Sequence, residues 1–163
     1  MAQLNAKLAE SKSHLELEKQ QLMKTKGEID AYRPEVAIPD AEKHMEKREY
    51  QEALRSLAKL SKGERKQPKV RRMIDKATPE LRQDRVAFSH EYEDSRLKIG
   101  EDYTVRASGP GDTTLTISYP LMNRPLVYQF ENNRDLIARI RGLGFKKMFL
   151  MDGAQNRWFF DFE

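Results

Sequence analysis

The fold is decided by the stretch Tyr103-Thr-Val-Arg-Ala-Ser-Gly-Pro-Gly-Asp-Thr-Thr-Leu-Thr-Ile-Ser-Tyr119. Apolar and polar residues alternate on both sides of its Gly-Pro-Gly centre, which is the period of two that half-buried strands show. The centre itself, residues 108–112, has the composition of a turn. The stretch therefore predicts a β-hairpin with strands at 103–107 and 115–119.

Two helices are expected to follow the hairpin. Residues 120–132 fit either a strand or a short helix that starts after Pro125, and we favour the helix. Asn133 has the side chain of a helix N-cap, and Gly142 is a suitable stop, so a second helix is predicted between them. Its inward side chains are expected to be Leu136, Ile137 and Ile140.

The last 20 residues predict two more strands. The run 145–151 is apolar on both faces, as a central strand requires, and an Asp-Gly turn leads into residues 157–162. In this last strand Trp158, Phe160 and Phe162 share one face. The order ββααββ predicts that residues 100–163 form a small α+β domain with a four-stranded, mostly antiparallel sheet and helices on one side.

The residues before the hairpin predict a helical region over 40–98. Pro34 and Pro39 disfavour helix at the residues that precede them, so a linker or tight corner is expected there. Asp40 is then the expected N-cap of the next helix. Further helices are expected at 68–77 and 79–97, the second with Thr78 as its N-cap and with one inward face formed by Leu81, Phe88 and Tyr92.

The N-terminal segment, residues 1–31, predicts a long amphipathic helix that resembles a coiled-coil strand. It lacks proline and is rich in Ala, Leu, Lys, Glu and Gln, which are strong helix formers. Its companion heptad series is mostly polar, so the helix either lies along another helix of the same chain or associates with another chain. The apolar residues that define its rail, at a strict spacing of seven, are Leu8, Leu15, Leu22 and Ile29.

One short segment carries most of the excess positive charge of the chain. Six basic side chains fall within the eleven residues 62–72, whereas the net charge of all 163 residues is +4. Such a cluster is typical of contacts with phosphates or anionic headgroups. The alternative is a solvated loop whose charges pair with Glu91, Glu93 and Asp94. The candidate anion-binding residues are Lys62, Arg65, Lys66, Lys69, Arg71 and Arg72.

Two stretches resemble known protein families. Residues 41–60 resemble one tetratricopeptide repeat through Ala41, Tyr50, Ala53, Leu57 and Leu60, with Arg48 in place of the usual turn glycine. The resemblance implies a helical hairpin and, more weakly, peptide binding. Residues 144–153 and the strand at Trp158 look like the ending of a group of uncharacterised bacterial proteins with a GFKxxxFxDG pattern, which implies a bacterial source and no activity.

No motif predicts an enzyme. The three histidines, His14, His44 and His90, have no second histidine at i+3 or i+4 that would complete a metal-binding pair, so we expect no metal site. The glycine pairs at 109–111 and 142–144 do not run from a strand into a helix N-terminus, as a phosphate loop does. The aspartates at 112, 152 and 161 are expected to be turn formers. We therefore predict no catalytic residues, no cofactor and no metal.

The predicted function is a non-enzymatic protein–protein interaction module, either an adaptor or an assembly module. Its candidate contacts are the rail of the N-terminal helix together with Phe149 and Phe159, which should face away from the sheet core. The alternative is a binder of nucleic acid or anionic lipid through residues 62–72. Because no apolar run is long enough for a transmembrane segment, we expect the chain in the cytoplasm or in the soluble part of an envelope protein whose anchor is absent from this sequence.

Overall fold

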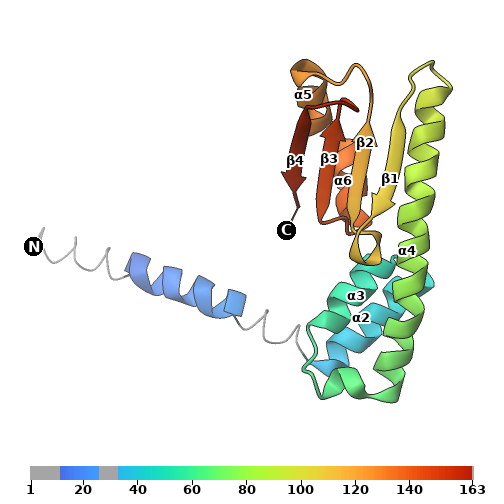
Figure 1. The fold of residues 1–163 in the computed structure, drawn as a ribbon. Helices are drawn as coiled ribbons and strands as arrows, with labels where there is room; N and C mark the ends of the chain where they lie inside the picture. Colours follow the sequence, from blue (N-terminus) through green and yellow to red (C-terminus); the bar gives the residue numbers. More distant parts are fainter. Residues whose placement is uncertain (1–11, 26–32, 163) are drawn as a thin grey trace, which may run out of the picture.

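The computed structural model describes residues 12–25 and 33–162, and confirms the α+β class (Figure 1). Residues 12–25 are helical. The helical region that follows contains α2 (Pro34–Glu46), α3 (Tyr50–Ala58), the short 3-10 helix η1 (Glu64–Lys66) and α4 (Pro68–Leu97). The C-terminal part contains β1 (Thr104–Ser108), η2 (Pro110–Asp112), β2 (Thr114–Ser118), α5 (Arg124–Asn132), α6 (Arg134–Gly142), β3 (Lys147–Met151) and β4 (Arg157–Asp161).

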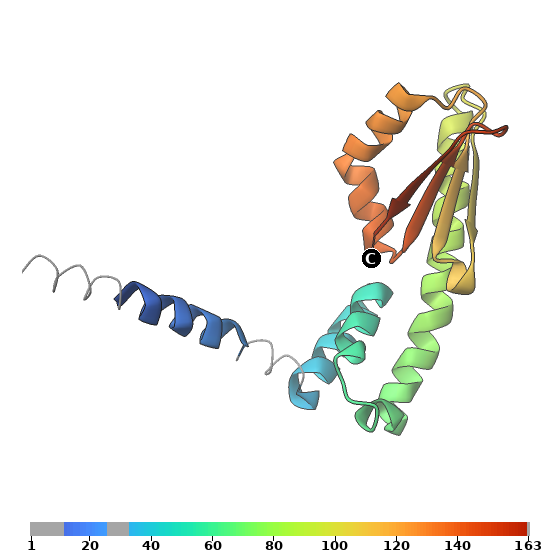
Figure 2. The ribbon, with the colours of Figure 1, turned by 60° about the vertical axis from the view of Figure 1, so that its left-hand side comes forward.

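The four strands form one sheet in the order β1-β2-β3-β4. The pairs β1–β2 and β3–β4 are antiparallel, and β2–β3 is parallel, as predicted for a mostly antiparallel sheet. A parallel pair needs a crossover, and α5 and α6 supply it across one face of the sheet (Figure 2). The core lies between that face and the helices.

The register of the sheet places one side chain of every strand in the same inward row. Val105 faces Ile117, Ile117 faces Leu150, and Leu150 faces Trp158. Burying such a row against α5 and α6 gives the C-terminal part its own hydrophobic core. The largest fully buried side chains in this core are Phe88, Leu115, Ile117, Ile140, Met148 and Leu150.

Two asparagine side chains start the crossover helices. The side-chain oxygen of Asn123 accepts a hydrogen bond from the Leu126 amide at 3.0 Å, and that of Asn133 accepts one from the Leu136 amide at 3.1 Å. Each satisfies an amide that the first helical turn leaves without a partner. The helix favoured for residues 120–132 and the helix predicted from Asn133 are both confirmed.

The break predicted at Pro34 and Pro39 is wrong, because α2 begins at Pro34 and continues through Pro39. Pro34 occupies the first helical position, where its missing amide proton costs nothing. Asp40 is therefore inside the helix and not its N-cap. Its carboxylate accepts a hydrogen bond of 2.6 Å from the Ser56 hydroxyl of α3, and this bond lowers the pKa of Asp40.

The N-cap predicted at Thr78 is also wrong, because α4 is one helix of 30 residues with Pro79 inside it. The Thr78 hydroxyl donates back to the Ile74 carbonyl at 2.8 Å. On either side of the proline, Ala77 and Leu81 are buried in one cluster with Tyr50 of α3. This packing outweighs the hydrogen bond that a proline removes from a helix.

Helices α2 and α3 pack against each other as a helical hairpin. Their shared cluster buries Ala41, Ala53 and Leu57 with Val70 of α4. Between the helices, Arg48 has a φ of 60°, the left-handed conformation that usually favours glycine. Arg48 thus adopts a backbone conformation that is more usual for glycine at a turn.

The stretch that resembles the GFKxxxFxDG pattern begins just after α6 and forms β3 and the start of the turn into β4. Gly144 and Gly153 have φ values of 67° and 79°. The Asp152 carboxylate accepts hydrogen bonds from the amides of residues 154, 155 and 156, and the pKa of this carboxyl is lowered by these bonds. Leu150, which is fully buried, stands where the pattern has its second phenylalanine.

Helix α4 belongs to both parts of the molecule. Its first half packs on α2 and α3, whereas Phe88 and Tyr92 of its second half pack in the sheet core. Its C-terminal half runs along β1, and the Glu93 carboxylate accepts the Val105 amide at 2.7 Å (Figure 1). The face formed by Leu81, Phe88 and Tyr92 is confirmed as the inward face of this helix.

Candidate functional site

The rail of the N-terminal helix is exposed where the structure describes it. The side chain of Leu15 is 66% exposed and that of Leu22 is 73% exposed, and every described residue of the helix 12–25 is exposed. Leu8 and Ile29, the other rail residues, lie outside the described residues. Leu15 and Leu22 therefore have no burial within the described part of the same chain.

The face of the sheet opposite α5 and α6 is open. No element within the ranges 12–25 and 33–162 covers it (Figure 2). Phe149 and Phe159 lie side by side on this face with ring centroids 5.2 Å apart, and Phe159 is 51% exposed. The guanidinium of Arg157 lies 3.7 Å from the centroid of the Phe149 ring. The face thus carries a small aromatic patch with a cation on it.

The basic segment 62–72 forms η1 and the first turn of α4, at the end of the molecule away from the sheet (Figure 1). All six cations are exposed. Lys69 pairs with Glu42 at 2.8 Å, and Arg71 lies 3.8 Å from Asp75. The four cations without an ion pair to any described residue are Lys62, Arg65, Lys66 and Arg72.

The pairing expected between the basic segment and the acidic stretch at 91–94 is wrong. Those residues lie near the opposite end of α4, because the helix is continuous through Pro79. Glu91 pairs with Arg139 of α6, and Glu93 accepts the Val105 amide. The basic charges of residues 62–72 are therefore not neutralised by Glu91, Glu93 and Asp94.

A buried arginine, absent from the residues that the sequence patterns indicated, joins the two parts of the molecule. Arg85 of α4 is 7% exposed, and burial lowers the pKa of its guanidinium against the opposing effect of the Asp112 charge. It donates to the carbonyls of Gly111 at 2.7 Å, Leu143 at 2.8 Å and Gly144 at 3.1 Å. The sequence does hold a signal for it, since Arg85 occupies the inward stripe between Leu81 and Phe88.

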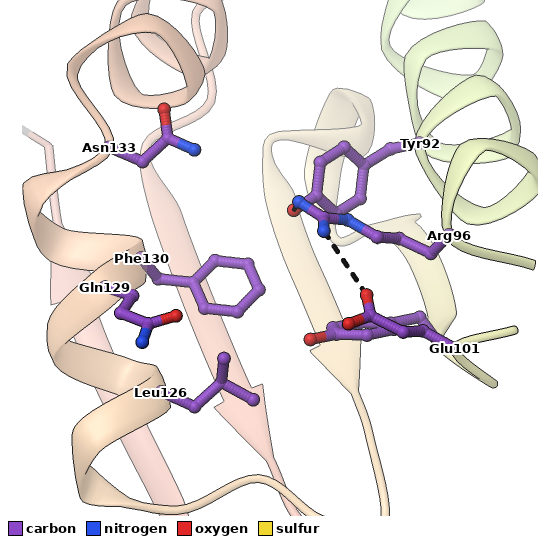
Figure 3. A pocket seen from close by; sticks show the side chains of 8 residues that line it. Tyr92, Arg96, Glu101, Leu126, Gln129, Phe130 and Asn133 are labelled. Carbon is purple, nitrogen blue, oxygen red and sulfur yellow. Dashed lines mark hydrogen bonds and ion pairs between the residues drawn. The ribbon is translucent and has the colours of Figure 1, made fainter. Parts of the chain in front are cut away.

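A polar pocket opens between the end of α4 and helix α5 (Figure 3). Phe130 and Leu126 point into it from one side, and Tyr92 and Arg96 from the other. The Arg96 guanidinium lies 5.0 Å from the centroid of the Tyr92 ring and forms an ion pair of 3.2 Å with Glu101. The pocket encloses about 130 Å³, less than the roughly 300 Å³ at which small-molecule sites begin. The Arg96 guanidinium already packs against the rings of Tyr92 and Tyr103, which form the aromatic walls of the pocket.

Burial also raises the pKa of the two tyrosines in this pocket, Tyr92 and Tyr103. It raises the pKa of Tyr92, and burial with the nearby Glu101 charge raises the pKa of Tyr103 to about 12. Both phenols therefore stay neutral at physiological pH. They are hydrogen-bonding and stacking groups here, and neither has the lowered pKa of a general base.

Two of the residues considered as ligands or catalytic groups, His44 and Asp112, have local partners. His44 lies 2.6 Å from Glu49 and 3.6 Å from Asp40, and Asp112 accepts a hydrogen bond from Arg82. Among the residues that the structure describes, no three His, Asp or Glu side chains gather as metal ligands. A second hollow of about 350 Å³ lies between α3, α4 and the β1–β2 turn, and its charged lining is Arg82 and Arg85.

Comparison with protein-family models, with curated proteins and with solved structures gives no match for this chain. Within the described ranges, the structure has no helix with the length and apolar character needed to cross a membrane. A functional assignment for this chain therefore depends on its own exposed surfaces and their chemistry.

Proposed function

We propose that this chain is a non-enzymatic protein–protein interaction module, an adaptor or assembly module that binds through the rail of its N-terminal helix. The observation that carries the proposal is the exposure of Leu15 and Leu22. Short isolated helices are marginal in water and are stabilised by packing of an apolar face. A second copy of this chain or another protein with an apolar helix face would supply that packing.

Replacing both Leu15 and Leu22 with alanine is expected to weaken association about a hundredfold or more, since each buried Leu→Ala change removes about 2 kcal/mol or more of packing. The measurements are molar mass by light scattering, and capture of partners by the purified chain. The melting temperature of the remaining domain should not change, because both side chains are exposed within the described chain.

The matched control for this experiment is Leu17→Ala. Leu17 is 58% exposed on the same helix but points about 200° away from Leu15, so it lies off the rail. Its replacement should leave association unchanged. A double variant that alters neither molar mass nor partner capture would contradict the proposal.

A second candidate function is binding of nucleic acid or anionic lipid by the basic segment. It is favoured by the four exposed cations that lack an ion pair to any described residue: Lys62, Arg65, Lys66 and Arg72. They gather at one end of the molecule, where a phosphate backbone or a charged surface has access. Stacking aromatics are absent from residues 62–72, so the expected mode is contact with phosphates.

Replacing Arg65, Lys66, Arg71 and Arg72 with serine tests this second function. Binding to a DNA oligonucleotide or to anionic vesicles should be lost at moderate salt. For DNA, the plot of log binding constant against log salt should become shallower by up to about 3.6. The control with the same change of charge replaces four exposed cations elsewhere, Lys47, Lys98, Arg124 and Arg134. Equal binding by both variants would remove the candidate.

A further inference from the structure

The two edges of the sheet differ in how they are protected. The β1 edge is covered by α4, whose Glu93 carboxylate accepts the outward amide of Val105 at 2.7 Å. The other edge is β4, which within the described ranges 12–25 and 33–162 has a neighbour only in β3. An uncovered edge strand is a template for pairing with another strand, and proteins usually protect such edges.

The hydrogen bonds between β3 and β4 show which backbone groups face outward. The Phe162 amide donates to the Lys146 carbonyl at 2.8 Å, and the Asp152 amide donates to the Asn156 carbonyl at 3.3 Å. Along an antiparallel strand, the backbone groups of successive residues point alternately toward the paired strand and away from it. The even-numbered residues of β4 therefore bond to β3. The odd-numbered residues, at 157, 159 and 161, direct their amides and carbonyls away from the sheet.

The sequence of β4 is complementary to itself in one antiparallel register. In Arg157-Trp-Phe-Phe-Asp161, Phe159 is the centre and the two ends carry opposite charges. If a second copy is placed with Phe159 opposite Phe159, Arg157 of each chain faces Asp161 of the other. All three facing pairs then consist of the outward residues, so each pair can exchange both backbone hydrogen bonds.

The side chains favour this register over its neighbours. Opposite charges that face each other across strands are stabilising, and so are aromatic pairs. A register shift that places Arg157 opposite Arg157, or Asp161 opposite Asp161, brings like charges together. It also leaves fewer residues of the two strands opposite each other. The Phe159 rings, half exposed on the open face of each sheet, would meet across the new boundary.

We infer that β4 pairs with β4 of a second copy around a two-fold axis at Phe159, which joins two four-stranded sheets into one. The interface is isologous, since the same strand contributes from both chains. This inference uses a surface separate from the N-terminal helix and does not rest on the function proposed above. The aromatic patches of the two open faces become continuous in the dimer.

The test uses the full chain carrying Leu15→Ala and Leu22→Ala, so that the helix does not contribute to association. Light scattering at rising protein concentration should show the mass increase from 19.1 kDa toward twice that value. Adding Phe159→Pro should abolish the increase, because proline lacks the outward amide proton while every β3–β4 bond remains. The control Phe159→Thr also loses the ring but keeps the amide, and should still dimerise.

Charge substitutions provide a second test that does not change the backbone. Arg157→Asp makes the edge acidic at both ends, and Asp161→Arg makes it basic at both ends. Each variant alone should dimerise about tenfold more weakly or worse, and an equimolar mixture of the two should recover association as a heterodimer. Melting temperatures of each variant report whether the fold is retained.

Three results would overturn the inference. One is a mass that stays at 19.1 kDa at every concentration in the Leu15→Ala, Leu22→Ala background. The second is dimerisation that Phe159→Pro leaves intact, and the third is a pair of charge variants that do not re-associate when mixed. Each of these results leaves the proposal for the helix rail unaffected, because that rail is tested in the chain with Leu15 and Leu22 present.

Discussion

The variant Arg85→Leu is expected to lower the free energy of unfolding by about 3 kcal/mol, because it leaves three carbonyl oxygens without their donor. These are the carbonyls of Gly111, Leu143 and Gly144, which the buried guanidinium satisfies together. Leucine fits the apolar stripe of α4 but donates nothing. Urea unfolding followed by circular dichroism gives the free energy directly.

Two control variants separate the role of this guanidinium from a general effect of charge. Arg82→Ala removes a neighbouring arginine whose side chain is 64% exposed, and it should cost less than about 1 kcal/mol. Arg85→Lys keeps the charge but loses the planar fork that reaches several acceptors, so an intermediate loss is expected. Equal stability of the Arg85→Leu and Arg82→Ala variants would show that the carbonyls find other donors.

The variant Phe88→Ala is expected to have the largest effect, a loss of about 3–5 kcal/mol. Phe88 is 2% exposed and lies between α4 and the sheet. Its ring centroid is 5.9 Å from that of Phe145 and 6.0 Å from that of Tyr92, and the Arg139 guanidinium lies 4.9 Å from it. Removing the ring leaves a cavity that these neighbours cannot fill without moving the helix.

Val86→Ala is the matched control for Phe88, since it lies two residues away on the outer side of the same helix and is 37% exposed. It should cost less than about 1 kcal/mol. Most small domains have a total stability of about 5–15 kcal/mol, so Phe88→Ala would remove a large fraction of it. Similar losses for the two variants would mean that α4 is not held to the sheet through Phe88.

The C-terminal half could be predicted well from the sequence because its signals are local. Alternation at residues 103–107 and 115–119 defines the hairpin, and Asn133 marks the start of α6 by a hydrogen bond to a residue three positions on. The outward direction of Phe159 follows from the same period of two. None of these features depends on which distant segment packs nearby.

The helical half was predicted less well because tertiary packing keeps two helices continuous where the local effect of proline favours a break. Pro39 and Pro79 each remove one helical hydrogen bond, and a rule based on neighbours alone places a break at both. Buried residues on both sides, such as Ala37 and Ala41 around Pro39, keep each helix continuous. The consequence for the basic segment was a wrong choice of acidic partner.

The partners of Arg85 and the pocket around Arg96 could not be predicted, because the residues that meet there are far apart in the sequence. Arg85 donates to backbone carbonyls 26, 58 and 59 residues away. Every residue has a backbone carbonyl, so residue types do not show which ones accept from Arg85. Arg96 lies between tyrosines of α4 and of the segment before β1. In a sequence that is 34% charged, the place of Arg85 on the inward stripe of α4 indicates burial, but no residue type indicates the partners of either arginine.

Because α4 is continuous, its length also sets the distance between the basic segment and the sheet. A helix of 30 residues is about 45 Å long, and this one begins in the basic segment and ends beside the sheet. A single inserted residue in its middle would lengthen it by about 1.5 Å and rotate one end against the other by about 100°. Any two partners held at the opposite ends would therefore face each other at an angle set by the count of residues between Pro68 and Leu97.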